Sequence, residues 1–374
     1  MAAITKRPTR LSDGRDLIYY DDADTTLVPE RKPDLREPSP RPATATMRQD
    51  PLTGEWVSIA AARQNRVMLP PAELDPLAPA TPSNPSEIPD LYDVAVFENK
   101  SPSFGPLLED GNAPEGADDL AQVGLERTRT SVGRCEVVCF SPATAGAFGS
   151  LTPSRARTVI EAWADRTTAL SALPGVRQVF PFENRGEAIG VTLHHPHGQI
   201  YAYPVVPPVP ARMQELAVEH HAKQRRTVLQ DLIAGERSDR RRMLYDGEHA
   251  VAFVPVCARY PYEVWVAPVE PVESFGRLTE AQRADLARAL KTVLLKYDGL
   301  WRRPFPYLMA WYQAPTDGQP HPESHLHAEF YPPYRTPDRL KYLAGTELAA
   351  GFFAMDALPE DKARELQQVE VNVA

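Results

Sequence analysis

Residues 189–204 read IGVTLHHPHGQIYAYP and hold three of the nine histidines in this 374-residue chain, at positions 194, 195 and 197. The residues after them are mostly β-formers, so the segment predicts a strand. Side chains alternate along a strand, which puts His195, His197 and Gln199 on one face. Histidines on strands are often structural, but two imidazoles and an amide in a row beside Gly198 favour a functional site.

The surroundings of this segment occur twice in the chain. EVVCF at 136–140 and FGSLT at 148–152 return, each 127 residues later, as EVWVA at 263–267 and FGRLT at 275–279. A helix-like stretch follows each time, at 152–173 and 279–301, and HPHGQIYAYP from His195 is matched by HLHAEFYPPY from His325. Three landmarks in the same order indicate an internal duplication. They predict an α+β fold of two related halves, with antiparallel sheet and helices packed on one side.

The duplication also divides the chain into segments. Residues 1–47 are polar and rich in proline and charge, which predicts a flexible N-terminal arm. One half of the duplication is expected over residues 48–208 and the other over 209–374.

Composition excludes several classes of protein. The net charge of −9 argues against a nucleic-acid binder that relies on neutralising phosphates. The N-terminus has no apolar signal region, and the chain has no run of about 18 apolar residues, so a cytoplasmic protein without membrane contact is expected. The three cysteines (Cys135, Cys139 and Cys257) are too few for a disulfide framework and form no C-x-x-C pair.

HPHGQIYAYP, preceded by ENRGEAIGVT, resembles the active-site segment of the galactose-1-phosphate uridylyltransferases, the transferase branch of the histidine-triad superfamily. DPLTGEWV, VFEN, CFSP and HLHAEFYPPYR with LKYLAG resemble the same family in the same order, over about residues 47–355. The resemblance implies two histidine-triad-like halves and a homodimer whose subunits complete each other's active sites. It implies UDP-glucose and a hexose 1-phosphate as substrates in galactose metabolism, with UMP passing through a covalent uridylyl-histidine.

The resemblance also assigns roles to the residues of the motif. His197 is implied as the nucleophile that attacks the α-phosphorus, with its second ring nitrogen bound to an acceptor such as a backbone carbonyl. Histidine-triad hydrolases carry a third histidine where this chain has Gln199, and an amide cannot pass a proton to water, which favours transfer over hydrolysis. His195 is expected to orient the surroundings of the nucleophile.

Substrate-binding residues follow from the same motifs. A lone arginine or lysine is as readily a solvated surface charge, so the order of these residues around the histidine segment is what favours a binding role. The expected set is Arg63 and Arg66 on the phosphate side, from the partner subunit; Asn99 and Asn184 at the nucleotide; Gly190 and Thr192 near the phosphoryl oxygens; and Lys341 near the sugar phosphate.

The sequence departs from the family where many relatives bind zinc. The cysteine positions hold Ala78 and Thr81, a further histidine position holds Thr144, and His195 alone cannot retain zinc against water. A second metal site of some relatives is represented by Tyr312, His327 and Glu329, with His325 and His321 nearby and no evident fourth ligand. We therefore expect no bound metal and no cofactor.

Two alternatives stay open. Phe353 stands at the position of a family glutamine near the sugar, so a related nucleotidyltransferase or phosphorylase could use another nucleotide sugar or acceptor, for example ADP-glucose with inorganic phosphate. A non-catalytic sugar-nucleotide binding protein is the other possibility, and the intact HPHGQ segment argues against it.

Overall fold

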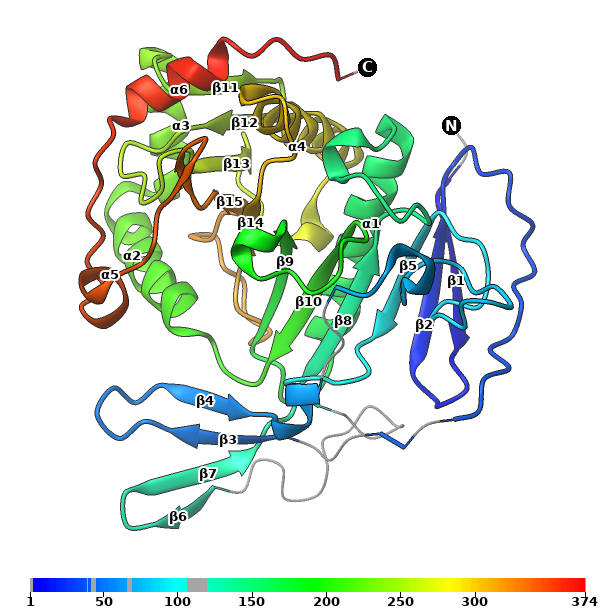
Figure 1. The fold of residues 1–374 in the computed structure, drawn as a ribbon. Coiled ribbons are helices and arrows are strands. Elements are labelled where there is room, and N and C mark those ends of the chain that lie inside the picture. Colours follow the sequence, from blue (N-terminus) through cyan, green and yellow to red (C-terminus); the bar gives the residue numbers. More distant parts are fainter. Residues whose placement is uncertain (1–2, 39, 42–44, 66–68, 106–119, 374) are drawn as a thin grey trace.

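An antiparallel sheet of eleven strands runs through the computed structural model, which describes residues 3–38, 40–41, 45–65, 69–105 and 120–373 (Figure 1). From one edge to the other the strands are β1 (Thr5–Arg10), β2 (Asp16–Asp21), β5 (Val94–Glu98), β8 (Arg134–Cys139), β10 (His197–Tyr203), β9 (Gln178–Arg185), β14 (Tyr307–Tyr312), β15 (His327–Tyr331), β13 (Val264–Pro268), β12 (Ala250–Phe253) and β11 (Met243–Asp246).

The two halves meet in the middle of this sheet. Strands β9 and β14 pair antiparallel, with Phe182 opposite Ala310. Outward from this pair, β10, β8, β5 and β2 on one side match β15, β13, β12 and β11 on the other. The predicted duplication and the α+β class are thereby confirmed, and the halves share one continuous sheet.

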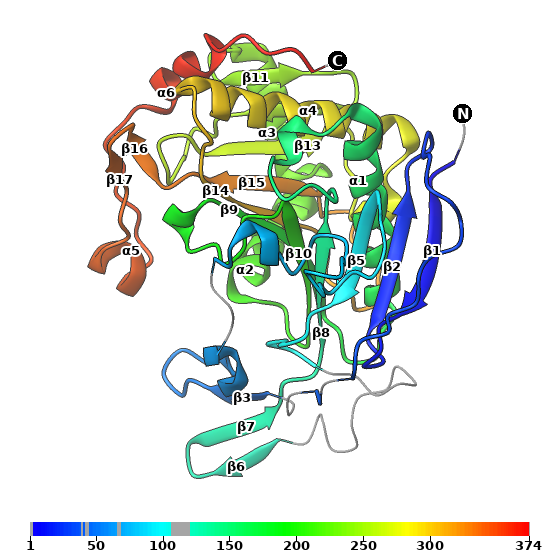
Figure 2. The ribbon, with the colours of Figure 1, turned by 45° about the vertical axis from the view of Figure 1, so that its right-hand side comes forward.

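Two long helices cover one face of the sheet, as predicted. Helix α1 (Pro153–Ser171) packs against strands of the first half, and α4 (Glu280–Leu300) packs against β11, β12 and β13 (Figures 1 and 2). Each begins at a threonine whose hydroxyl accepts a backbone N–H three residues on, Thr152 for α1 and Thr279 for α4. These hydroxyls satisfy helix-end donors that would otherwise lack a partner.

Aromatic side chains beneath these helices join the halves into one core. The Trp163 ring of α1 stacks on Phe148 at 5.8 Å and also lies 5.6 Å from Phe275 and 5.8 Å from Trp311, both in the second half. Trp163 and Trp311 are fully buried. Neither half therefore has a complete core without the other.

Among the described residues, the opposite face of the sheet packs against loops in the first half and against helices in the second. In the first half the loop residues Leu77, Ile88 and Tyr92 pack on β5 and β8, and in the second half α3 (Val228–Asp239) packs on β11, β12 and β13. Between these covers the face of β10 and β9 is half-buried and carries an aromatic cluster: Phe180, Phe182, Tyr201 and Tyr203. The histidine segment enters this half-buried part of the sheet.

The expectation of a flexible arm over residues 1–47 is wrong for its first half. Strands β1 and β2 pair with each other, and β2 adds to β5 at the edge of the main sheet. Leu17, Tyr19 and Tyr20 are buried, and Asp21 pairs with Arg7 and Arg31. The prediction failed because the polar average of the segment masks the short apolar run LIYY, whose flanking charges are neutralised by pairing.

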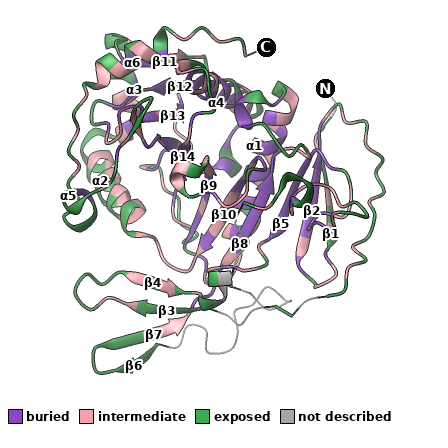
Figure 3. Cartoon of the chain, viewed as in Figure 1, coloured by how far each residue is buried: buried purple, intermediate pink, exposed green. Residues whose placement is uncertain are grey.

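A second, smaller sheet projects from the main body (Figures 1 and 2). Its strand order is β4 (Trp56–Ile59), β3 (Thr46–Gln49), β7 (Glu126–Thr130) and β6 (Ala121–Val123). Figure 3 shows mostly exposed and intermediate residues in it, against the largely buried main sheet. The C-terminal region adds a hairpin, β16 (Tyr334–Thr336) with β17 (Arg339–Leu340), and two short helices, α5 (Gly345–Ala349) and α6 (Pro359–Gln367).

Among the described residues, no helix combines the length and the apolar character that a membrane crossing requires.

Candidate active site

Strand β10 presents the histidine segment to this half-buried part of the sheet. Its residues alternate between buried and half-buried, and the half-buried set begins with His197 and Gln199. Gly198 between them faces inward, where an added Cβ would lie 3.0 Å from the Phe140 ring and 3.1 Å from the carbonyl oxygen of Phe182. Glycine at this position lets β10 lie close enough to its neighbours to hold His197 in place.

Among the described residues, one nitrogen of the His197 ring has a hydrogen-bond partner and the other has none. Nδ1 lies 2.6 Å from the carbonyl oxygen of His195, an acceptor only, so Nδ1 carries the hydrogen and donates it. Burial lowers the pKa of His197 and outweighs the opposite effect of this hydrogen bond. The neutral ring thus keeps a lone pair on Nε2, which is the form that acts as a nucleophile.

The ring of His195 is enclosed by hydrogen-bond acceptors. Nδ1 lies 2.7 Å from Oδ2 of Asp75, and Nε2 lies 2.8 Å from the carbonyl oxygen of Ser141 and 3.0 Å from the hydroxyl of Tyr92. Burial raises the pKa of Asp75, but the hydrogen bond and charge of His195 and the backbone N–H groups of Leu77 and Ala78 lower it by more. The pKa of Asp75 therefore lies below its usual value. Asp75 is thus ionised at neutral pH and accepts from His195.

These contacts do not fit a zinc ion at the position where the family resemblance suggests one. Both ring nitrogens of His195 are engaged, and a backbone carbonyl at the first cysteine position, that of Ala78, accepts from Ser86. Thr81, at the second cysteine position, bonds within its own turn to Asn84 and Ser83. Zinc sites in proteins need three or four thiolate, imidazole or carboxylate donors, and no such group of three occurs among the described residues.

A cavity of about 280 Å³ opens beside His197. The loop of residues 186–196, the end of β9 and the C-terminal part of α4 enclose it, and both His195 and Asn184 line it. Oδ1 of Asn184 is buried there without a hydrogen-bond partner. The cavity therefore combines a free imidazole nitrogen with an unused amide oxygen, which suits a polar ligand.

Three charged residues of this cavity were missed by the sequence reasoning. Arg185 forms a double hydrogen bond with Asp298 at 2.7 and 3.0 Å. Glu183 is fully buried, accepts from the Tyr307 hydroxyl at 2.9 Å, and has a pKa raised to about 7 by burial. Glu183 and Arg185 lie within ENRGEAIG, but Asp298 comes from a helix more than a hundred residues away, so only the fold could have found it. The same holds for Asp75 and Tyr92.

Two other predicted residues lie together at the far end of β10. Arg63 donates to the carbonyl oxygen of Ser101 at 2.6 Å, and Asn99 accepts from the N–H of Ser101 at 2.9 Å. The N–H of Asn99 bonds the carbonyl of Cys135, which lies opposite Tyr201 in the sheet. Tyr201 is four residues along β10 from His197, which corresponds to about 13 Å. The face from His197 to Tyr201 is long enough for an extended ligand.

The remaining predicted residues have separate surroundings. Gly190 ends a short 3-10 helix with φ of 77°, a left-handed conformation that favours glycine. The carbonyl oxygen of Thr192 accepts from Leu69 at 2.8 Å. Lys341 is buried near α5, where it donates to the Ala354 carbonyl at 2.6 Å. Helix α5 lies well away from β10 in Figures 1 and 2. Arg66 lies outside the described residues.

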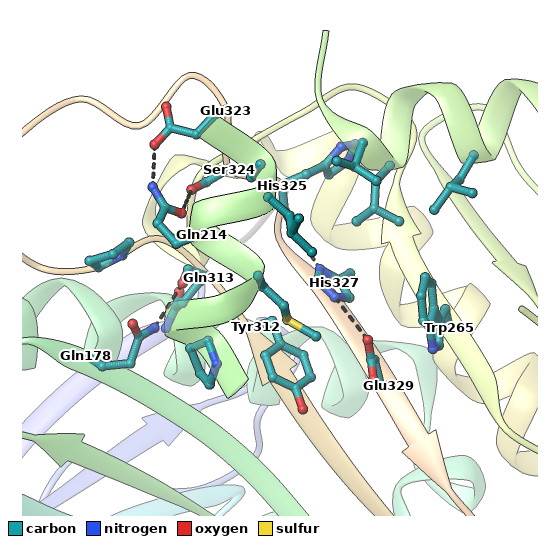
Figure 4. A pocket seen from close by; sticks show the side chains of 18 residues that line it. Gln178, Gln214, Trp265, Tyr312, Gln313, Glu323, Ser324, His325, His327 and Glu329 are labelled. Atoms are coloured by element: carbon teal, nitrogen blue, oxygen red, sulfur yellow. Dashed lines mark hydrogen bonds and ion pairs between the residues drawn. The ribbon is translucent and has the colours of Figure 1, made fainter. Parts of the chain in front are cut away.

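The second half contains a matching arrangement. A cavity of about 270 Å³ lies between α2 (Pro208–Gln224), α3 and the sheet, with Trp265, Tyr312 and His327 on its wall (Figure 4). Nδ1 of His327 donates to the carbonyl oxygen of His325 at 2.8 Å, as His197 donates to His195. Glu329 occupies the position equivalent to Gln199.

The residues at this second position do not fit a metal ion either. Both ring nitrogens of His325 are bound, Nδ1 with the Thr227 hydroxyl and Nε2 with the Pro268 carbonyl, each at 2.9 Å. The carboxylate of Glu329 accepts from Arg259 and from the Tyr331 hydroxyl. The guanidinium of Arg259 already supplies the positive charge that this buried carboxylate requires.

Comparison with known proteins places this geometry in a family. A profile described as galactose-1-phosphate uridyl transferase, N-terminal domain, matches residues 36–207, and the profile of the C-terminal domain matches residues 213–373. The galactose-1-phosphate uridylyltransferase of Streptomyces lividans is 39% identical over 344 residues, 88% of each chain. That of Thermotoga maritima is 34% identical over 87% of this chain and 99% of its own.

Solved structures agree with the sequence comparisons. A uridylyltransferase structure superposes with a TM-score of 0.75 at 28% identity, covering 87% of this chain and 98% of its own. An ADP-glucose phosphorylase from Arabidopsis thaliana superposes with a TM-score of 0.65 at 22% identity, over 87% of this chain and 99% of its own, and shares the fold.

The match of a uridyl transferase profile to each half of the duplicated sheet makes the chain a nucleotidyltransferase. The two family profiles and the relatives above narrow the class further. The chain belongs to the galactose-1-phosphate uridylyltransferase family.

Proposed function

We propose that this protein transfers UMP from UDP-glucose to galactose 1-phosphate in two displacements at His197. One observation carries the proposal: Nδ1–H of His197 is held by the His195 carbonyl at 2.6 Å, while Nε2 is left free beside a polar cavity. A neutral imidazole in this tautomer can attack phosphorus without first losing a proton.

In the first displacement, Nε2 forms a bond to the α-phosphorus and the bond from that phosphorus to the bridging oxygen breaks. Glucose 1-phosphate leaves with the electron pair of that bond. The ring becomes cationic as it is uridylylated, and the His195 carbonyl, already bound to Nδ1–H, stabilises the positive charge. In the second displacement a phosphate oxygen of galactose 1-phosphate attacks the same phosphorus, and Nε2 leaves as the neutral ring.

The other predicted residues are proposed to bind the substrate. Gln199 lies on the same face as His197 and is proposed to donate to a phosphoryl oxygen without supplying a proton to water. Asn184 has a free amide oxygen in the cavity, and Gly190 and Thr192 lie in the loop that closes it. Asn99, at the Tyr201 end, is proposed to meet the nucleotide, and Arg63 is proposed to meet the phosphate side of the site in the partner subunit.

Isotope exchange tests this function and its closest alternative. With no acceptor present, label from glucose 1-phosphate is expected to enter UDP-glucose, because the first displacement is reversible and needs no second substrate. Parallel reactions with ADP-glucose, and with inorganic phosphate in place of galactose 1-phosphate, test the phosphorylase alternative. Exchange with ADP-glucose but not with UDP-glucose would contradict the proposal. Exchange with neither nucleotide sugar would show that the protein does not catalyse this transfer.

We also propose that the protein is a homodimer with active sites shared between subunits. The resemblance implies that Arg63 reaches the phosphate side of the site from the partner subunit, and within its own subunit Arg63 bonds the Ser101 carbonyl, well along the sheet from His197. The small sheet exposes apolar side chains, among them Val57, Ile59, Val123 and Leu125. An exposed patch of this kind is typical of an association surface.

Mixing two inactive variants tests the shared site. Subunits with His197→Gly and subunits with Arg63→Ala are co-expressed, so that hybrid dimers carry one intact site. Activity of about a quarter of the wild type is expected, because half of the dimers are hybrids with one working site of two. Complete inactivity of the mixture, with dimers present in sedimentation, would contradict shared sites.

A further inference from the structure

The buried residues that hold the His195 ring, Asp75 and Tyr92, have no role in the reaction steps proposed above. We propose that Asp75 is a positioning residue for uridylyl transfer: it anchors the His195 ring, and thereby the main-chain carbonyl that fixes the tautomer of His197, at the position where the family resemblance suggests a metal. This inference rests on the proposed function, because it concerns the nucleophile of that reaction.

Asp75 and His195 are held more firmly than a surface ion pair. Both are buried, at 6% and 3% exposure, and Tyr92 beside them is 1% exposed. The second carboxylate oxygen of Asp75 accepts the N–H of Leu77 at 2.9 Å, which fixes the orientation of the carboxylate. A buried carboxylate that is hydrogen-bonded through both oxygens is held in one orientation. The imidazole ring bound to it is therefore held in place as well.

The main chain next to His195 depends on this anchor. Pro196 has no N–H, so the peptide between His195 and Pro196 cannot be tied to a neighbour through its own nitrogen. The Pro196 carbonyl accepts from Phe140 at 3.0 Å, which secures the chain on the far side of the proline. On the near side the buried contacts next to the proline are those of the His195 ring, whereas the His194–Glu187 pair at 3.4 Å is exposed and the Leu69–Thr192 bond lies three residues back. The ring contacts therefore contribute most to where the His195 carbonyl points.

The second half of the chain contains the same device in an uncharged form. His325 is also buried with both ring nitrogens bound, and its carbonyl also receives Nδ1–H of the histidine two residues on, His327. Its anchor is the hydroxyl of Thr227, not a carboxylate. The two halves therefore share ring anchoring of the first histidine, and the half with the free nucleophile uses the stronger, charged hydrogen bond.

Two substitutions at Asp75 and one matched control test the role. Asp75→Ala removes the anchor, whereas Asp75→Asn keeps the size and one acceptor oxygen. The control is Asp285→Asn, a buried aspartate of the second half that accepts backbone N–H groups of His249 and Ala250 at 2.7 and 2.9 Å. Measured quantities are the rate of covalent uridylylation, the KM for UDP-glucose and, by nitrogen-15 NMR of the histidines, the tautomer of His197.

Asp75→Ala is expected to slow uridylylation about 100-fold and Asp75→Asn about tenfold, because displacing a reacting group by about 1 Å costs on the order of 10²-fold. The KM is expected to change by less than about threefold, since Asp75 does not touch the substrate. The NMR spectrum should show His197 as a mixture of tautomers in Asp75→Ala and as one tautomer in the control.

A wild-type rate and a single tautomer in folded Asp75→Ala would overturn the inference. If that variant does not fold, Asp75→Asn decides the question, and an unchanged rate there with an unchanged spectrum overturns it equally. Failure of the proposed function looks different: the wild type itself would form no uridylyl adduct, while the tautomer measurement would still report on Asp75.

Discussion

Transfer by this chain depends, at the scale of single residues, on which nitrogen of His197 carries the hydrogen. The carbonyl of His195 takes Nδ1–H, and burial keeps the ring neutral by lowering its pKa. Gln199 then favours transfer of the uridylyl group over its hydrolysis, because an amide donates hydrogen bonds but does not pass protons to or from water.

The depressed pKa of His197 predicts a shift in pH dependence. The neutral ring is the reactive form, and an ordinary histidine, with a pKa of 6.5, would be half protonated at that pH. Because the pKa is lower here, the rate of the first displacement at pH 6.5 should exceed half of its plateau at higher pH. Single-turnover release of glucose 1-phosphate across the pH range measures this. A midpoint at or above 6.5 would contradict the account.

Replacing Gln199 by histidine should divert UMP to water. Imidazole can pass protons where an amide cannot, and general acid–base assistance contributes at least about 10²-fold to such steps, so faster UMP release from UDP-glucose without acceptor is expected. Gln199→Ala, which loses the donor without gaining a base, is the control and should slow both outcomes. If both variants release UMP at the wild-type rate, Gln199 does not protect the intermediate.

The sequence revealed the nucleophile and its amide neighbour but not their supports. His197 and Gln199 stand in one contiguous motif, so spacing alone puts them on one face. Asp75, Tyr92 and Asp298 reach the site from a loop and a helix distant in the chain, and nothing in their local sequence distinguishes them from ordinary surface residues. The same applies to Arg259, which pairs with Glu329 where the sequence had suggested a metal ligand.

At the scale of elements, the packing of strand β10 against its neighbours helps to fix the position of His197. Gly198 is the residue through which β10 touches Phe140 and the Phe182 carbonyl, and its neighbour is His197. The position of the nucleophile is therefore determined by the packing of the strand as well as by its hydrogen bond.

Gly198→Ala should lower both stability and rate. The new Cβ would meet the Phe182 carbonyl at 3.1 Å, and that backbone cannot move easily because β9 is paired on both sides. Overpacking of this kind costs about 1–3 kcal/mol of unfolding free energy. Urea denaturation measures it, with Gly235→Ala in α3 as the control, since an added Cβ meets nothing within 4 Å there. Gly235→Ala should be about 0.5–1 kcal/mol more stable than the wild type, because alanine is favoured over glycine inside a helix. Equal stability of the two variants would count against the packing argument.

The helices were easier to predict than the first strands. The sequences after FGSLT and FGRLT each begin with a threonine cap, and α1 and α4 start one residue after it at Pro153 and Glu280. Strands β1 and β2 escaped prediction because a four-residue apolar run in a charged segment becomes stable only when β5 supplies a partner strand.

At the scale of the whole molecule, the two halves share one sheet and one aromatic core. The duplication was visible in the sequence, but the pairing of β9 with β14 was not, because alternation specifies the face of a strand and not its neighbour. That pairing, with the aromatic core beneath it, makes each half depend on the other.

Trp163→Ala should destabilise both halves together. The ring contacts Phe275 and Trp311 of the second half, and removal of a buried tryptophan costs about 3–5 kcal/mol. Hydrogen exchange should rise in α4 as well as in α1. The control is Trp301→Ala, whose ring lies just after α4 and, among the described residues, has its aromatic partners (Tyr262, Phe305 and Tyr334) in the second half. Faster exchange confined to α1 in Trp163→Ala would show that the halves unfold separately.

The central claim is that His197 carries the uridylyl group, and direct detection of the adduct tests it most simply. The protein is incubated with UDP-glucose without acceptor, digested under conditions that spare phosphoramidates, and mapped by mass spectrometry, with His197→Gly treated in parallel. The account predicts a uridylyl adduct on His197 that disappears when galactose 1-phosphate is added and never forms in the variant. An adduct on another residue, or glucose 1-phosphate release by the variant at the wild-type rate, would contradict it.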